Sequence, residues 1–166
     1  MPAPEPTPQM LVQPAQLLRL PAKADPRAHA LLAYWRRMAA GRAMPCRSDI
    51  DPLDIPDLLP HLTLVDVREA EPRFVYRLVG TAAVALMKQD LTGRPVGTGV
   101  KPSELAAVLA RYRRVAEEGV AIFQHTPLQE DANDHSWVNR LMLPLASATD
   151  GRPAMILSLL VAAGQT

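Results

Sequence analysis

Three strand-like segments follow one another at the C-terminal end of the chain, and they constrain the fold more than any other feature. They span residues 120–128, 136–146 and 153–162. The last two are separated by a short segment containing Asp150-Gly151, a dipeptide typical of tight β-hairpin turns. Strands joined by such short turns pair antiparallel. The sequence therefore predicts an antiparallel sheet here.

A long amphipathic helix precedes these strands. Ser103 is expected to cap its N-terminus, and Gly119 can take the left-handed conformation that ends a helix. Six apolar residues recur at helical spacing and should be buried: Leu105, Val108, Leu109, Tyr112, Val115 and Ala116.

Two further strands are predicted upstream, at 62–68 and 73–80, and the short link between them suits a hairpin. A short helix over 81–89, with Thr81 as its N-cap, and a glycine-containing loop then lead to the long helix. In the second strand, Phe74, Tyr76 and Leu78 alternate with Val75, Arg77 and Val79.

A separate helix is predicted near the N-terminus. Asp25 is a good N-cap, Pro26 suits the first helical position, and Gly41 can end the helix. Its apolar stripe must pack on the domain or on a second copy of the chain. We expect an exposed stripe and hence a homodimer interface formed by Leu31, Leu32, Trp35 and Met38.

Proline is concentrated in the N-terminal third, where 11 of the 17 prolines lie at or before Pro60. Because proline removes a backbone donor and restricts its neighbour, residues 1–24 are predicted to be a mobile or loosely packed arm. Residues 25–61 would form the first helix and a connector, and residues 62–166 the core of the domain.

Composition excludes several classes of function. The net charge of +1 and the 4% aromatic content argue against a nucleic-acid partner. No apolar stretch is long enough to span a membrane, and the N-terminus lacks the pattern of a secretory signal. A single cysteine supports neither a disulfide nor a thiolate-rich metal site. We therefore expect a cytoplasmic protein with no membrane or metal partner.

The element order and several phrases resemble a PAS domain, and more closely the alphaproteobacterial PAS_5 family of short proteins. The phrases are "AYWRRMAAGRAMPCRSDIDPLDIPDLLPHLTLVDV", "RFVYRLVGTAAVAL", "DLTGRPV" and "RLMLPLASATDG". The resemblance implies an α+β fold: a five-stranded antiparallel sheet with helices on one face and an extra N-terminal helix. It also implies a bacterial sensory or interaction module that can hold a small molecule between sheet and helices.

The stretch from Cys46 to Leu62 combines the cysteine with His61 and four aspartates, as a catalytic or metal site would. A Cys–His pair needs direct approach and an orienting third group, whereas here three prolines intervene. An EF-hand loop would require a central glycine and a final glutamate. Capped turns explain the aspartates better, so we interpret the stretch as a connector with no catalytic residue.

Five side chains on the strands are candidates for binding a ligand: Tyr76, Arg77, His125, Trp137 and Arg140, with Asn139 beside them. The simpler interpretation is an ion pair or a solvated sheet face. His125 could in principle ligate haem, but no second motif supports haem or flavin. The segment "RYRR" at 111–114 is interpreted as a solvated helix face.

We therefore predict a non-enzymatic sensory module that binds a small molecule or an unknown signalling protein and acts as a homodimer. A small α+β enzyme that uses the sheet cavity, and a structural interaction protein without ligand, are the alternatives.

Overall fold

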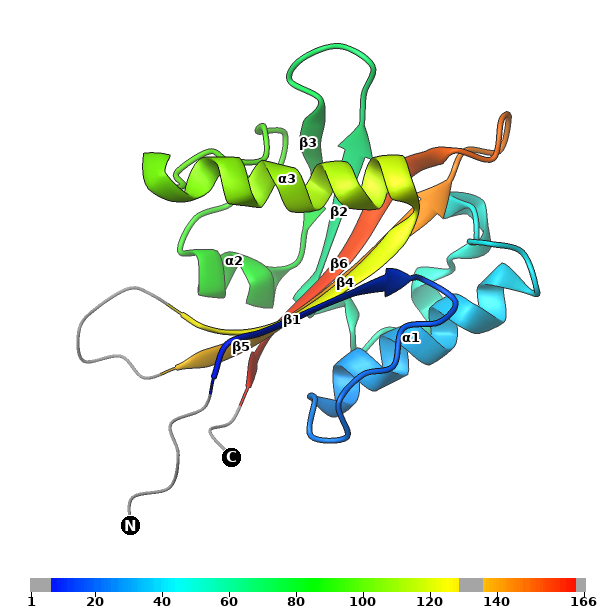
Figure 1. Ribbon diagram of the computed structural model, residues 1–166, viewed down its shortest axis with the longest axis horizontal. Coiled ribbons are helices and arrows are strands. Elements are labelled where there is room, and N and C mark those ends of the chain that lie inside the picture. The colour runs from blue at the N-terminus through cyan, green and yellow to red at the C-terminus, as the bar shows by residue number, and fades with distance from the viewer. Residues whose placement is uncertain (1–6, 129–135, 164–166) are drawn as a thin grey trace.

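The computed structural model describes residues 7–128 and 136–163. Its centre is a six-stranded sheet with the order β1-β4-β5-β6-β2-β3, in which every neighbouring pair is antiparallel (Figure 1). The fold class predicted from the sequence is confirmed, including the C-terminal meander and the hairpin at Asp150-Gly151. The strands are β1 Gln9–Pro14, β2 Leu62–Val67, β3 Phe74–Val79, β4 Val120–Pro127, β5 Trp137–Ala146 and β6 Pro153–Ala163.

Three α-helices accompany the sheet: α1 Pro26–Ala39, α2 Thr81–Met87 and α3 Pro102–Glu118. Figure 1 shows α2 and α3 together across the strands, whereas α1 lies apart from them beyond β1. No helix in the described part of the chain combines the length and apolar character needed to cross a membrane.

The helix ends follow the sequence closely, with small corrections. The Asp25 carboxylate accepts a hydrogen bond from Arg27 N and caps α1 as expected. The left-handed residue that ends α1 is Ala40 rather than Gly41, whereas Gly119 ends α3 as predicted. Lys101 and Gly80 hold the N-cap positions expected for Ser103 and Thr81, so α3 begins two residues earlier and α2 one residue earlier than predicted.

Strand β1 differs from the expected arm. Residues 9–14 pair with β4 from Gln9–His125 to Pro14–Val120, which adds a sixth strand at the sheet edge. Ala15, Leu18 and Ala24 are also buried, so the segment that precedes α1 is packed. An edge strand tolerates proline because one row of its backbone groups needs no partner in the sheet. The part of the expected arm before residue 7 lies outside the described residues.

The two faces of the sheet bury separate clusters of apolar side chains. Phe123 and Leu141 lie in the cluster formed with α1 and the connector 46–61, and we call this side the α1 face. Ile122 and Met142, one residue away on the same strands, lie in the cluster that contains Val115 of α3. We call that side the α3 face. The alternation of side chains along each strand produces this division.

A β-bulge breaks the alternation in β3. Leu64 pairs with Leu78, but the next residue, Val65, pairs with Tyr76, so Arg77 is an extra residue. A bulge of this kind re-aims the side chains that follow it. Tyr76 therefore belongs to the cluster on the α3 face, whereas Leu78 borders the α1 face.

The stripe of α1 is buried within its own chain, which corrects the expected dimer interface. Leu31 and Trp35 have an exposed fraction of 0% and Leu32 of 3%, and Met38 packs against the same cluster. Trp35 Nε1 also donates a hydrogen bond to the carbonyl oxygen of Pro144 in β5, at 2.9 Å. These side chains hold α1 on the sheet and are not available to a partner.

Candidate functional site

A cavity of about 330 Å³ lies on the α3 face. Strands β3, β5 and β6 form its floor, and α2, α3 and the loop 97–101 form its walls. Its polar side chains come from both layers, since Tyr76 and Arg140 belong to strands and Arg111 and Tyr112 to α3. This volume is at the lower end of the range of small-molecule sites.

Two tyrosines meet in this cavity. Tyr76 has an exposed fraction of 8% and Tyr112 of 3%. Burial, followed by the neighbouring Tyr112, raises the pKa of Tyr76, although the charge of Arg140 acts in the opposite direction. Tyr76 is therefore a neutral hydroxyl that can donate or accept a hydrogen bond.

Arg111 lines the same cavity, and part of its guanidinium group has no hydrogen-bond partner in the described chain. Its Nε is buried and makes no hydrogen bond within the described chain. Burial lowers the pKa of Arg111, and the positive charge of Arg140 lowers it further. Neither arginine takes part in an ion pair among the described residues.

The entrance of the cavity is formed by the loop 97–101 and the first half of α3. Residues 101–107 are exposed although α3 already begins at Pro102. Gly97 lies close to Leu105, because an added Cβ would come within 2.5 Å of Leu105 Cδ1. Leu105 was expected in the buried stripe, but it is 36% exposed. The glycine-containing loop therefore borders the cavity.

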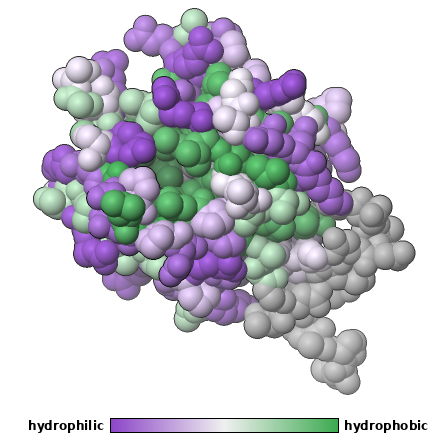
Figure 2. Space-filling view, turned by 180° about the vertical axis from the view of Figure 1, so that it is seen from behind, coloured by the Kyte–Doolittle hydropathy of each residue, from purple (hydrophilic) through white to green (hydrophobic). Residues whose placement is uncertain are grey.

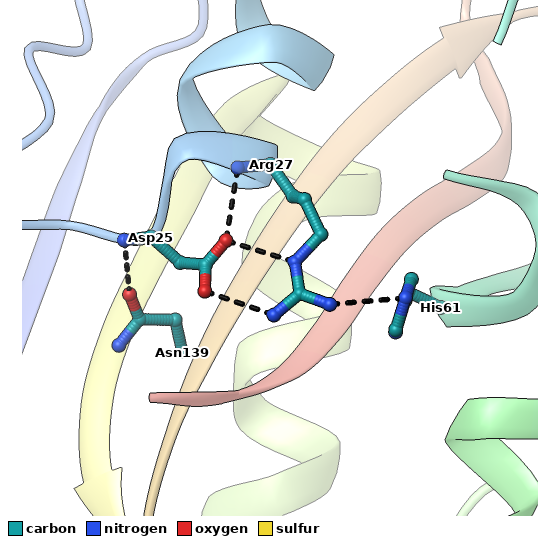
Figure 3. Close-up of polar contacts among 4 residues, drawn as sticks. All are labelled: Asp25, Arg27, His61 and Asn139. Atoms are coloured by element: carbon teal, nitrogen blue, oxygen red, sulfur yellow. Dashed lines mark hydrogen bonds and ion pairs between the residues drawn. The ribbon is translucent and has the colours of Figure 1, made fainter. Parts of the chain in front are cut away.

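A polar network on the α1 face joins the start of α1 to the sheet (Figure 3). The backbone N–H of Asp25 donates to Asn139 Oδ1 of β5 at 2.9 Å. The Asp25 carboxylate pairs with Arg27 through two hydrogen bonds of 2.9 and 3.0 Å. Arg27 Nη1 in turn lies 3.1 Å from His61 Nε2, at the end of the connector. Arg27 lowers the pKa of Asp25, which favours the carboxylate form.

Two histidines on this face, His61 and His125, each accept a hydrogen bond through an unprotonated ring nitrogen. An arginine can only donate, so His61 Nε2 must accept from Arg27. Asn139 Oδ1 already accepts from Asp25, so its Nδ2 donates to His125 Nδ1 at 2.8 Å. Burial lowers the pKa of both histidines, and the positive charges of Arg27 and Lys23 add to the effect at His61 and His125 respectively.

The five candidate ligand residues are divided between the two faces. Tyr76 and Arg140 come together in the cavity on the α3 face. Arg77 forms an ion pair with Asp66 at 2.9 Å, and its side chain is 59% exposed. Arg77 therefore fits the simpler interpretation, an ion pair on the sheet. His125 and Trp137 stack on each other with ring centroids 4.6 Å apart. His125 lies beside Asn139 on the α1 face, where a pocket of about 160 Å³ borders both residues.

Arg111 and Tyr112 were not predicted as cavity residues. Arg111 was grouped with the solvated helix face, an assignment that holds for Arg113 and Arg114, which are exposed. The spacing from Glu104 through Val108 to Arg111 places these residues on one side of a helix, next to the apolar stripe. A buried charge at the edge of an apolar stripe was the available signal.

The stretch around Cys46 is a connector in the structure. Asp49 Oδ2 accepts from the backbone N–H of Cys46 at 2.8 Å and from Arg42 at 2.8 Å. Asp51 caps the next short turn, and Tyr34 donates to Asp54 at 3.0 Å. His61 is engaged with Arg27 instead of the thiol. No cluster of three metal-ligating side chains occurs within residues 7–128 and 136–163.

An apolar hollow lies on the α1 face, beside the connector. Figure 2 shows the side turned away from the viewer of Figure 1, where hydrophobic side chains gather in a hollow bordered by hydrophilic ones. A small pocket there is lined almost entirely by apolar residues, including Leu78, which is 49% exposed. Leu53 in the adjoining connector is 85% exposed.

Comparison with known families decides the classification. A model of the PAS_5 family, described as a PAS domain, matches residues 23–161. The chain belongs to the PAS_5 family. The PAS match covers α1, the connector and five strands, and β1 lies before its first residue. The resemblance read from the sequence is thus confirmed.

Two further comparisons concern solved structures and curated proteins. A light-oxygen-voltage receptor described as RNA-binding is similar in structure, with a TM-score of 0.49 and 18% sequence identity. The match covers 96% of this PAS chain and 40% of the receptor chain. A search of curated proteins found no match to the chain.

Proposed function

We propose that this PAS domain is a sensory module that binds a small molecule in the cavity on the α3 face. The observation that carries the proposal is the buried Nε of Arg111, which lacks a hydrogen-bond partner while lining a cavity of about 330 Å³. Buried polar groups in folded proteins nearly always have a partner. A ligand that accepts a hydrogen bond from Arg111 would supply it.

The arrangement of the cavity supports the same proposal. Its floor belongs to the central strands, whereas its entrance belongs to a loop and the exposed first half of α3. Rigid elements can orient a ligand, and the less packed entrance can respond to it. Occupancy of the cavity would thereby change the position of α3 and the loop.

We further propose that the signal leaves the domain through protein contacts, in a homodimer or with a signalling protein. Exposed apolar residues such as Leu53 and Leu78 favour a protein contact over an isolated domain. The role is one of binding and transmission, with no chemical step assigned to any residue.

Native mass spectrometry tests the proposal. The purified protein is measured with and without denaturation, so that a bound small molecule appears as a mass difference. Val138→Phe, at a 6% exposed position that lines the cavity, should abolish the bound mass without unfolding the protein. Leu53→Phe adds the same ring at an exposed position and should leave the bound mass unchanged. Equal binding by both variants would contradict the proposed site.

A further inference from the structure

Two arginines share the cavity on the α3 face, and neither forms an ion pair with a carboxylate within residues 7–128 and 136–163. Arg111 of α3 and Arg140 of β5 both line it. The positive charge of Arg140 lowers the pKa values of both Arg111 and Tyr76 relative to what burial alone would give. Glu104 is the acidic residue that the described lining contains, and it forms no ion pair with either arginine. The cavity therefore carries an excess of positive charge.

This arrangement is unfavourable for the empty protein. Arginine stays protonated, so two like charges that are partly withdrawn from water repel each other. An unpaired buried charge costs far more than a paired one. The neighbouring hydroxyl of Tyr76 can accept a hydrogen bond, but burial raises its pKa, so it is neutral and cannot balance the charge.

Apolar side chains form another part of the lining, beside polar residues such as Gln89 and Thr98. Leu86 and Met87 of α2, Val108 of α3, and Val138 and Leu160 of the sheet line the cavity. An inorganic ion would leave this apolar surface without a partner. A molecule with one charged end and an apolar body would cover it, and the volume of about 330 Å³ limits that body to a small one.

We propose that the ligand of this cavity is a small organic anion. Its oxyanion head, a carboxylate or a phosphate, lies between the guanidinium groups of Arg111 and Arg140, with the Tyr76 hydroxyl as an additional donor. Its apolar body lies among the leucine, valine and methionine side chains. The inference rests on the proposed ligand-binding function and adds the chemical class of the ligand.

Both head groups suit an arginine pair, since guanidinium groups recognise the planar carboxylate and the phosphate through parallel hydrogen bonds. A lysine would offer a point charge without this geometry. The structure thus assigns two roles, with the arginines selecting the charged head and the apolar wall selecting the body.

Calorimetric titration with matched pairs of compounds tests the assignment. Benzoate and hexanoate are compared with benzamide and hexanamide, which keep the body and remove the charge. Phenyl phosphate and hexyl phosphate test the alternative head, and inorganic phosphate tests an ion without a body. We expect the anions of one head group to bind at least about tenfold more tightly than the amides.

Variants connect this preference to the two arginines. Arg111→Gln and Arg140→Gln should each weaken anion binding by about tenfold or more and leave amide binding unchanged. Arg113→Gln, on an exposed position of the same helix, should behave as the wild type. Circular dichroism of each variant confirms that it is folded.

The outcomes separate the two proposals. Amides that bind as tightly as the anions would overturn the anion assignment and leave ligand binding in place. Inorganic phosphate that binds as tightly as the organic anions would also overturn it. If no compound binds and native mass spectrometry of the purified protein finds no bound molecule, the proposed function fails together with the inference.

Discussion

The two faces of the sheet differ in how completely side chains fill the space above the strands. On the α1 face, the large side chains of Leu31 and Trp35 fill the space, and the polar groups of Asp25, Arg27 and Asn139 satisfy one another. On the α3 face, the cavity leaves Arg111 Nε without a partner. The α3 face holds the larger cavity, although Arg36 Nε of α1 is also buried without a hydrogen-bond partner among the described residues.

This difference indicates where stability and function reside. The buried apolar side chains and paired polar groups of the α1 face contribute to folding. A face with an open volume and like charges gives up stability in order to bind. Substitutions on the α1 face should therefore affect folding, and substitutions on the α3 face should affect binding.

The largest effect is expected from a charge in the core of the α1 face. Leu31→Glu and Trp35→Glu would each place an unpaired carboxylate at a position with 0% exposure, so the domain should unfold. Circular dichroism and thermal melting measure the loss. Ala33→Glu, on the exposed side of the same helix, is the control and should remain folded.

This experiment also tests the correction to the expected dimer. If the stripe of α1 were an interface between two copies, the charged variants would be folded monomers. Light scattering of the variants distinguishes a folded monomer from an unfolded chain. A folded monomer would contradict the assignment of α1 to the core of its own chain.

The next effect is expected at Gly80, where the connector and α2 meet. A Cβ at this position would lie 2.4 Å from the carbonyl oxygens of Leu59 and Pro60, which are backbone atoms that cannot rotate away. Gly80→Ala should therefore lower the free energy of unfolding by several kcal/mol, of the order of an overpacked core. Urea denaturation measures it.

A matched glycine separates this clash from backbone strain. Gly93 has a φ of +80° and nothing within 4 Å of its added Cβ. Gly93→Ala should cost only about 1–2 kcal/mol, the penalty of a left-handed alanine. Equal losses at the two positions would show that the contact between the connector and α2 is not tight.

A pH dependence should be confined to the α1 face. His61 and His125 accept hydrogen bonds there, and their folded-state pKa values are lowered. The unfolded chain takes up protons first, near pH 6.5, so the stabilisation is complete above that pH. Stability should fall as the pH drops below about 6.5 and level off below the folded-state pKa values.

Melting temperatures measured between pH 8 and pH 5 check this dependence. His61→Gln and His125→Gln should each flatten the decline. His29→Gln is the control, since His29 lies on the exposed side of α1 and hydrogen-bonds to the Pro21 carbonyl oxygen. A decline that persists in the double variant would assign the pH dependence to other groups.

The smallest effect, of opposite sign, is expected on the α3 face. Arg111→Met keeps much of the side-chain volume and removes a partly buried charge that repels Arg140. The ligand-free protein should therefore gain up to about 1 kcal/mol of stability. Arg113→Met, at an exposed position, should change little. A loss of stability in Arg111→Met would mean that the arginine supports the fold.

The sequence predicted the elements that local signals determine. Asp25 and Pro26 at the start of α1, Gly119 at the end of α3 and Asp150-Gly151 in the last hairpin each act within a few residues. Local hydrogen bonds and backbone preferences fix such positions, so a single sequence suffices to find them.

Features that depend on distant partners were not predictable in the same way. Strand β1 contains proline at its end and forms only because β4 offers an open edge. The bulge at Arg77 moves Leu78 to the other face, which the alternating pattern could not indicate. Arg111 looked like a surface residue because its burial depends on the sheet beneath α3.

The central proposal is that the α3 face, and not the α1 face, binds the ligand. Heteronuclear NMR of the protein titrated with an organic anion that binds in the calorimetric test measures this most directly. The amide signals of Tyr76, Arg111, Tyr112 and Val138 should shift, while those of Leu31 and Phe123 should stay in place. Shifts concentrated at His125 and Asn139, around the small pocket on the α1 face, would contradict it.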